Sequence, residues 1–131
     1  MNAFRYTVKT AKSVPEAVQS VERATAARGF RVLHIHDVAQ TLAEKGFHRE
    51  PLQIVEICNS KYAHEVLQKD VGTALMLPCP IVVYAVNGAT QIETMLPSVM
   101  KDFFPAAGIE SVAELVEKAV IAIVDESARG E

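Results

Sequence analysis

The chain has 131 residues, of which half are hydrophobic and 22% are charged, and its formal net charge is -3. This size and composition predict a single globular domain over residues 1–131 with a hydrophobic core of its own. The balanced charges give no basic surface for nucleic acid, and no apolar stretch is long enough to cross a membrane. Two cysteines do not make a disulfide framework, so we expect a cytoplasmic protein with reduced thiols.

The first part of the chain predicts a strand, a helix and a second strand. Alternation of apolar and polar residues over positions 4–9 is typical of a half-buried strand. Ser13-Val14-Pro15-Glu16 has the residues of a capping box, which predicts a helix from this point to Gly29. Phe30–His36 reads as the next strand, with Leu33 and Ile35 on one face and Val32, His34 and His36 on the other.

The middle of the chain alternates short helices with strands. Asp37 is placed to cap a short helix that runs to about Lys45 and is ended by Gly46. Leu52–Cys58 predicts a strand, after which Asn59 is placed to cap another helix. These signals predict a short helix, a strand and a second helix, joined by short connections.

Three apolar runs follow. Ala74–Leu77 and Ile81–Val86 are separated by two prolines, and both runs read as strands. Asn87-Gly88 then stands between Ile81–Val86 and Ala89–Met95, and this dipeptide is the strongest short signal for a tight hairpin turn. We therefore expect an antiparallel pair at this point.

The last part of the chain predicts a short helical stretch from Pro97 and a long C-terminal helix. Ser111-Val112-Ala113-Glu114 again has the residues of a capping box, and an amphipathic pattern runs on from about Val112. We expect this helix to cover the sheet beside the first helix. The predicted fold class is α+β, with an antiparallel-dominated sheet and helices packed mainly on one face.

The two cysteines lie in the segments Glu56-Ile57-Cys58-Asn59 and Leu77-Pro78-Cys79-Pro80, each at the end of an apolar run. Alternation puts Glu56 on the same strand face as Cys58. We expect Glu56, Cys58 and Cys79 to line one partly enclosed patch, with Asn59 beside it and the sulfur atoms unbonded on neighbouring strands. The alternative is that the thiols fill the core and Glu56 is a solvated charge.

His34 and His36 are two residues apart, on one face of their predicted strand. A short pair of this kind can start a zinc site, and Cys58, Cys79 or Glu56 would have to complete it. The alternative is two histidines on a solvated face. We therefore count both as candidate ligand-binding residues and assign no metal.

Several segments in order along the chain resemble a known family. They are Leu42–Phe47, Val55–Asn59, Lys61–Ala63, Leu77–Cys79, Val82–Tyr84 and Thr94-Met95. Together they resemble the domain of unknown function 302 family, also called the TT-1751-like fold group. The resemblance implies a two-layer β-α-β(4)-α core, related in shape to the TATA-binding-protein fold, and often a homodimer. It implies no activity, because the family is uncharacterised.

Three functions from different classes remain open. The first is a protein that binds a small ligand or handles thiols, with a pocket around the two cysteines and Glu56. The second is a homodimeric interaction module with structural cysteines, favoured because strands Ile54–Cys58 and Ile81–Val86 carry apolar or neutral groups on both faces. The third is an enzyme with Cys58 as its nucleophile.

Overall fold

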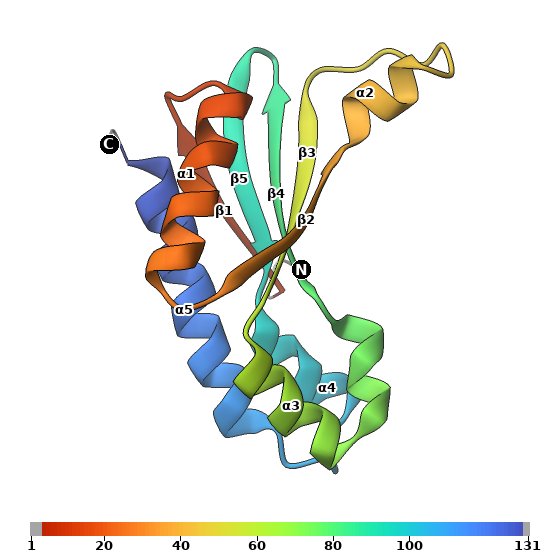
Figure 1. Ribbon diagram of the computed structural model, residues 1–131, viewed down its shortest axis with the longest axis vertical. Helices are drawn as coiled ribbons and strands as arrows, with labels where there is room; N and C mark the ends of the chain where they lie inside the picture. The colour runs from red at the N-terminus through yellow and green to blue at the C-terminus, as the bar shows by residue number, and fades with distance from the viewer. Residues whose placement is uncertain (1–3, 130–131) are drawn as a thin grey trace.

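The computed structural model describes residues 4–129, which form a five-stranded sheet with its two long helices on one face (Figure 1). Neighbouring strands are all antiparallel, in the order β1-β5-β4-β3-β2. The strands are β1 (Arg5–Thr10), β2 (Arg31–Asp37), β3 (Leu52–Cys58), β4 (Cys79–Val86) and β5 (Ala89–Met95). The helices are α1 (Val14–Ala27), α2 (Val38–Ala43), α3 (Ser60–Lys69), α4 (Met100–Phe103) and α5 (Glu110–Ala128), with 3-10 turns η1 (Val71–Met76) and η2 (Pro97–Val99). The predicted two-layer α+β fold with its β-α-β(4)-α core is confirmed.

The start of α1 is the capping box that the sequence predicted. The Ser13 hydroxyl accepts a hydrogen bond from the Glu16 backbone N–H at 3.3 Å, and the Glu16 carboxylate accepts one from the Ser13 N–H at 2.9 Å. These bonds hold the pKa of Glu16 below its usual value. Two of the unpaired N–H groups at the helix start are thereby satisfied.

The main core lies between the sheet and the helices α1 and α5, which run side by side over it. Fully buried aliphatic side chains come from every layer. The cluster includes Val21 of α1, Ile57 of β3, Ile81 and Val83 of β4, Ile92 of β5, and Val120, Ile123 and Val124 of α5. The predicted place of the C-terminal helix beside the first is confirmed.

A smaller cluster, which we call the lower cluster, lies beyond one end of the sheet. It consists of Val66, Met100, Ile109 and Val112, from α3, α4 and the start of α5. Figure 1 shows α3 and α4 beside this part of α5, below the sheet. Helix α5 therefore packs against both hydrophobic clusters.

The start of α5 differs from the prediction. The helix begins at Glu110, its N-cap residue is Ile109, and no side chain caps it. Ser111 lies inside the first turn, so the predicted capping box is wrong here. The physical reason is burial, because Ile109 is completely enclosed in the lower cluster and fixes where the helix starts.

The faces of β2 also differ from the prediction. The register passes from Val32 opposite Ile57 to His34 opposite Glu56, which makes Leu33 the extra residue of a bulge. Val32 therefore packs on the main core with Ile35, whereas Leu33 is exposed. The face predicted for Val32 and Leu33 is wrong, because a bulge shifts the alternation by one residue.

The run Ala74–Leu77 is not a strand. It belongs mostly to η1, and the Asp70 side chain accepts a hydrogen bond from the Gly72 N–H at 2.8 Å at the start of this turn. Cys79 therefore begins β4 instead of ending a strand. Since β3 and β4 are antiparallel, the first residue of β4 still lies next to the end of β3, where Cys58 is.

The hairpin between β4 and β5 is confirmed, with Val86 paired to Ala89. Asn87 and Gly88 both have positive φ, 53° and 79°, as a type I′ turn requires. The Glu50 carboxylate accepts hydrogen bonds from both of their N–H groups, at 3.0 and 3.1 Å. The loop before β3 is thereby tied to the hairpin.

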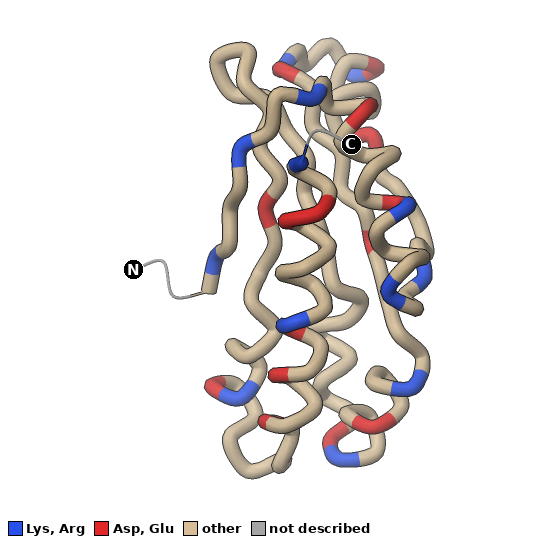
Figure 2. The backbone as a smooth tube through the Cα atoms, turned by 90° about the vertical axis from the view of Figure 1, so that its left-hand side faces the viewer, with Lys and Arg blue, Asp and Glu red and all other residues tan. Residues whose placement is uncertain are grey.

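Charges of both signs are interspersed along the backbone, as Figure 2 shows for one side of the molecule. Within residues 4–129, no helix is long and apolar enough to cross a membrane.

Candidate functional site

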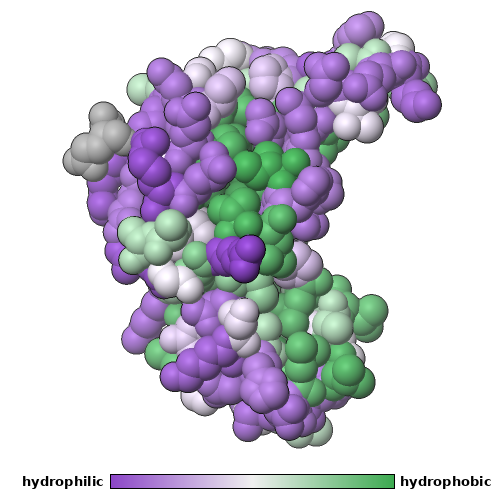
Figure 3. All heavy atoms as spheres, in the orientation of Figure 1, coloured by the Kyte–Doolittle hydropathy of each residue, from purple (hydrophilic) through white to green (hydrophobic). Residues whose placement is uncertain are grey.

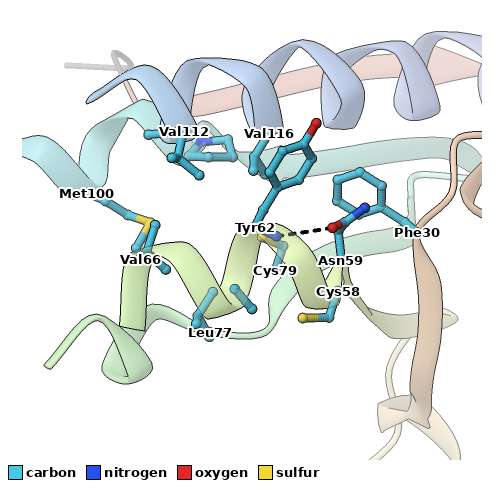
Figure 4. A pocket seen from close by; sticks show the side chains of 13 residues that line it. Phe30, Cys58, Asn59, Tyr62, Val66, Leu77, Cys79, Met100, Val112 and Val116 are labelled. Atoms are coloured by element: carbon cyan, nitrogen blue, oxygen red, sulfur yellow. Dashed lines mark hydrogen bonds between the residues drawn. The ribbon is translucent and has the colours of Figure 1, made fainter. Parts of the chain in front are cut away.

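An apolar pocket lies where the main core meets the lower cluster (Figure 4). Its cavity volume is about 30 Å³, and the empty space out to and including open solvent at the mouth is about 400 Å³. The lining side chains come from both clusters and from the segments between them. They are Phe30, Cys58, Asn59, Tyr62, Ala63, Val66, Leu77, Cys79, Pro97, Met100, Val112, Ala113 and Val116.

Asn59 fixes the geometry of the pocket at the junction of β3 and α3. Its side-chain oxygen accepts a hydrogen bond from the Tyr62 N–H at 3.1 Å, as the sequence predicted for a capping residue. Its side-chain nitrogen donates to the Gly29 carbonyl at 3.2 Å. Both ends of the amide are therefore bonded within the protein, and the chain turns sharply after Cys58.

Aromatic rings form one side of the pocket. The rings of Phe30 and Tyr62 have centroids 6.2 Å apart at an interplanar angle of 46°. In Figure 4 the Tyr62 hydroxyl points away from both sulfur atoms, while Val66 and Met100 lie at the other end of the pocket. The surface offered to a ligand is therefore hydrocarbon, aromatic ring and sulfur.

Both thiols are free and both are less acidic than usual. Burial raises the pKa of Cys79 to about 11, and the nearby Cys58 adds to the effect. Burial also raises the pKa of Cys58, although the Asn59 backbone N–H opposes it. Both groups are therefore protonated at neutral pH, and burial, not Glu56, is the cause.

Glu56 does not line this pocket. It lies opposite Pro80 on the sheet face that α1 and α5 leave uncovered, whereas Ile57 lies opposite Cys79 on the helix-covered face. The expectation that Glu56 shares an enclosed patch with both cysteines is therefore wrong. Cys58 reaches the pocket because it is the last residue of β3, where Asn59 turns the chain.

The two histidines lie with Glu56 on the uncovered face. His36 Nε2 is 3.1 Å from Glu56 Oε2, and the rings of His34 and His36 have centroids 4.4 Å apart in an edge-on arrangement. Both cysteines lie apart from this group, in the pocket. Among residues 4–129, no three His, Cys, Asp or Glu side chains gather to hold a metal ion.

The uncovered face, which we call the open face, carries a row of side chains across all five strands. From β2 to β1 the row is His36, Ile54, Val82, Glu93 and Thr7. Ile54 and Val82 form its apolar centre.

Two opposite charges on this face, Arg5 and Glu93, are paired within the chain. Glu93 bonds to Arg5 Nε at 2.5 Å and accepts a hydrogen bond from the Tyr84 hydroxyl at 2.6 Å. Arg5 holds the pKa of Glu93 below its usual value, and burial, with Glu93, raises the pKa of Tyr84. Glu56 has His36 beside it.

Sequence reasoning found Cys58, Asn59 and Cys79 but missed most of the pocket wall. Phe30, Tyr62 and Met100 were not predicted as site residues, because they belong to three separate segments. One signal was present for Tyr62. It lies three residues after the capping Asn59, which places it in the first turn of α3, next to Cys58.

The comparisons with known proteins agree with the fold. The family model described as "Domain of unknown function DUF302" matches residues 6–127. The chain is also similar to the crystal structure of an uncharacterised conserved DUF302 protein from Bacillus stearothermophilus, at 31% sequence identity. That match covers 97% of this chain and 99% of the other, with a TM-score of 0.90. Among curated proteins the comparison found no match.

Proposed function

The chain belongs to the DUF302 family, and we propose that it is a small-ligand-binding protein whose ligand is uncharged and apolar. The observation that supports this most is the pocket between the two hydrophobic clusters, with both cysteines on its wall. In this function the two thiols line the pocket and take part in no reaction.

The chemistry of the wall supports an uncharged ligand. The amide of Asn59 is engaged at both ends, and the two thiols are protonated at neutral pH. A charged ligand would lose its water shell here and find no partner of opposite charge, which is costly. Thioether, thiol and aromatic groups favour hydrocarbon or sulfur-containing ligand groups instead.

The size of the pocket sets a second limit. An apolar cavity of about 150 Å³ takes up benzene or xenon. The cavity here, at about 30 Å³, is well below that volume. A ligand as large as benzene must therefore widen the pocket.

Methyl NMR spectra of the protein test the proposal, with xenon and benzene as uncharged probes and benzoate as a charged counterpart of benzene. We expect xenon and benzene to shift the methyl signals of Val66, Val112 and Val116, while benzoate leaves them in place. Ala63→Leu should fill the pocket and abolish the shifts. Ala26→Leu adds the same side chain on an exposed site of α1 and should not.

The proposal is contradicted if neither uncharged probe shifts the pocket methyls, or if benzoate binds there as well as benzene.

The raised pKa values oppose the third function considered from the sequence, an enzyme with a cysteine nucleophile. Catalytic thiols are usually more acidic than a free cysteine, because the thiolate is the nucleophile. The pKa values of Cys79 and Cys58 are instead raised, so both thiols are less acidic than a free cysteine. Reduced, protonated thiols suit the cytoplasm, where we propose that the protein works.

A second candidate function, homodimeric assembly, is favoured by the open face. Its apolar centre at Ile54 and Val82 is not covered by α1 or α5, and Arg5 and Glu93 are already paired within the chain. A partner could therefore cover the central strands without leaving these charges unpaired. A second copy, which presents the same apolar centre, meets this requirement.

Light scattering at micromolar concentration tests this assembly. We expect the mass of a dimer for the natural chain and of a monomer for Val82→Lys, which puts a charge at the centre of the face. The control Leu75→Lys changes an exposed residue of η1, away from the sheet, and should remain dimeric. A natural chain that is monomeric would contradict the assembly.

A further inference from the structure

Residues 38–51, which we call the arm, stand away from the body of the molecule. Figure 1 shows α2 and the following loop projecting beyond the sheet edge, and Figure 3 shows the same segment as a protrusion. None of the residues of α2 is buried. Helix α2 contacts β3 of its own chain, but a helix this short gains little stability by itself, so a partner on its outer side would add to its stability.

The arm is nevertheless well held. The Asp37 carboxylate caps α2 by accepting a hydrogen bond from the Gln40 N–H at 3.1 Å. At the other end, the Phe47 N–H donates to the Leu42 carbonyl at 3.0 Å, and Gly46 has the positive φ of 87° that such a helix end requires. The bonds from Glu50 to the hairpin then fix the base of the arm.

Phe47 is the exposed apolar group on this arm, at 67% exposure. A groove lies at the base of the arm, between α2 and the open face, with an empty volume of about 640 Å³ including open solvent. The groove is lined by His36, Val38, Thr41, Leu42, Ile54 and Glu56. Its apolar residues and its continuity with the open face make it suited to an aromatic side chain.

We propose that Phe47 of one copy of the chain inserts into the groove of a second copy, and that the second copy does the same in return. This inference rests on the proposed homodimer and assigns its anchor. Each chain carries both the projecting ring and the groove, which is what a two-fold interface requires.

Charge favours the same partner. Lys45 and Arg49 flank Phe47, while the carboxylate of Glu50 is held at the hairpin, so only Glu44 opposes them at the tip. The groove presents the carboxylate of Glu56. A cationic tip and an acidic groove on the same chain are complementary across a two-fold axis.

The dimer dissociation constant, measured by sedimentation equilibrium, tests the inference. Phe47→Ser should raise it at least tenfold, because the anchor is lost. Phe103→Ser is the matched control, since Phe103 is also 67% exposed but lies on α4, at the other end of the molecule. This control should leave the dissociation constant unchanged. Both substitutions replace exposed side chains, so both variants should fold.

The outcomes separate the two proposals. A dimeric natural chain whose dissociation constant is unchanged by Phe47→Ser overturns the arm as anchor and leaves the homodimer standing. A natural chain that stays monomeric at protein concentrations 100 times higher than the micromolar concentrations used for light scattering overturns both proposals. Equal weakening by Phe47→Ser and Phe103→Ser also overturns the inference, because loss of any exposed ring would then suffice.

Discussion

The two hydrophobic clusters of this molecule differ in how they are built. The main core joins two long helices and all five strands, and its residues lie on regular, repeating faces. The lower cluster joins α3, the four-residue helix α4, the 3-10 turn η1 and the start of α5 around Val66, Met100, Ile109 and Val112. Regular elements produce a closely packed core, whereas the irregular ones leave a pocket where the two clusters meet.

The largest expected effect comes from a charge placed in the main core. Ile123→Asp should lower the free energy of unfolding by about 3 kcal/mol, because Ile123 is fully buried in α5 and the carboxylate would have no partner. Leu115→Asp is the control on the same helix, at a position that is 51% exposed. Denaturant melts that give the same stability for both variants would mean that α5 is peripheral.

The packing of the two clusters can be compared through the free energy of unfolding lost when one buried isoleucine of each is replaced by alanine. Ile92→Ala in the main core should cost about 3 kcal/mol, and Ile109→Ala in the lower cluster about 2 kcal/mol, because looser surroundings collapse more easily into the space left. Both side chains are fully buried in the natural chain, so burial alone predicts equal losses. Equal losses in urea melts would show that the lower cluster is as rigid as the main core.

The sequence predicted the main core better than the lower cluster, and the reason lies in periodicity. Ser13 and Glu16 at the start of α1, and Asn87-Gly88 in the hairpin, act through neighbours in the chain, so their effects are readable locally. The start of α5 was wrong because burial of Ile109 against distant segments decides it. The bulge at Leu33 and the 3-10 turn before Cys79 likewise depend on contacts outside the segment.

The candidate site shows the same division. Cys58, Asn59 and Cys79 were identified because a capping asparagine follows β3 and prolines flank the start of β4. Glu56 was wrongly grouped with the cysteines, because alternation alone does not show that the chain turns at Asn59, directly after Cys58. The aromatic wall of the pocket required tertiary structure.

Stability should also depend on pH through the buried thiol at the junction of the clusters. The pKa of Cys79 is raised from 9.0 to about 11, so its contribution is complete below about pH 9 and is lost as the pH rises toward 11. The loss should be about 2 kcal/mol. Cys79→Val should show a smaller decline in urea melts over this range, and an unchanged decline would assign it to other groups.

A smaller effect is expected at Thr25, which is fully buried in α1. Its hydroxyl has no hydrogen-bond partner among residues 4–129. Thr25→Val removes this group at nearly constant volume and should raise the free energy of unfolding by about 1 kcal/mol. A destabilised variant in the same melts would show that the hydroxyl is satisfied in solution.

The alkylation rate of each cysteine, with and without benzene, tests the ligand pocket most directly. Cys58→Ser and Cys79→Ser variants allow each remaining thiol to be followed alone with iodoacetamide at pH 8. With a pKa of about 11, only about 0.1% of Cys79 is thiolate at that pH, so it should react much more slowly than Cys58. Benzene should slow both thiols if it fills the pocket that they share, whereas rates unchanged by benzene would contradict the pocket as a ligand site.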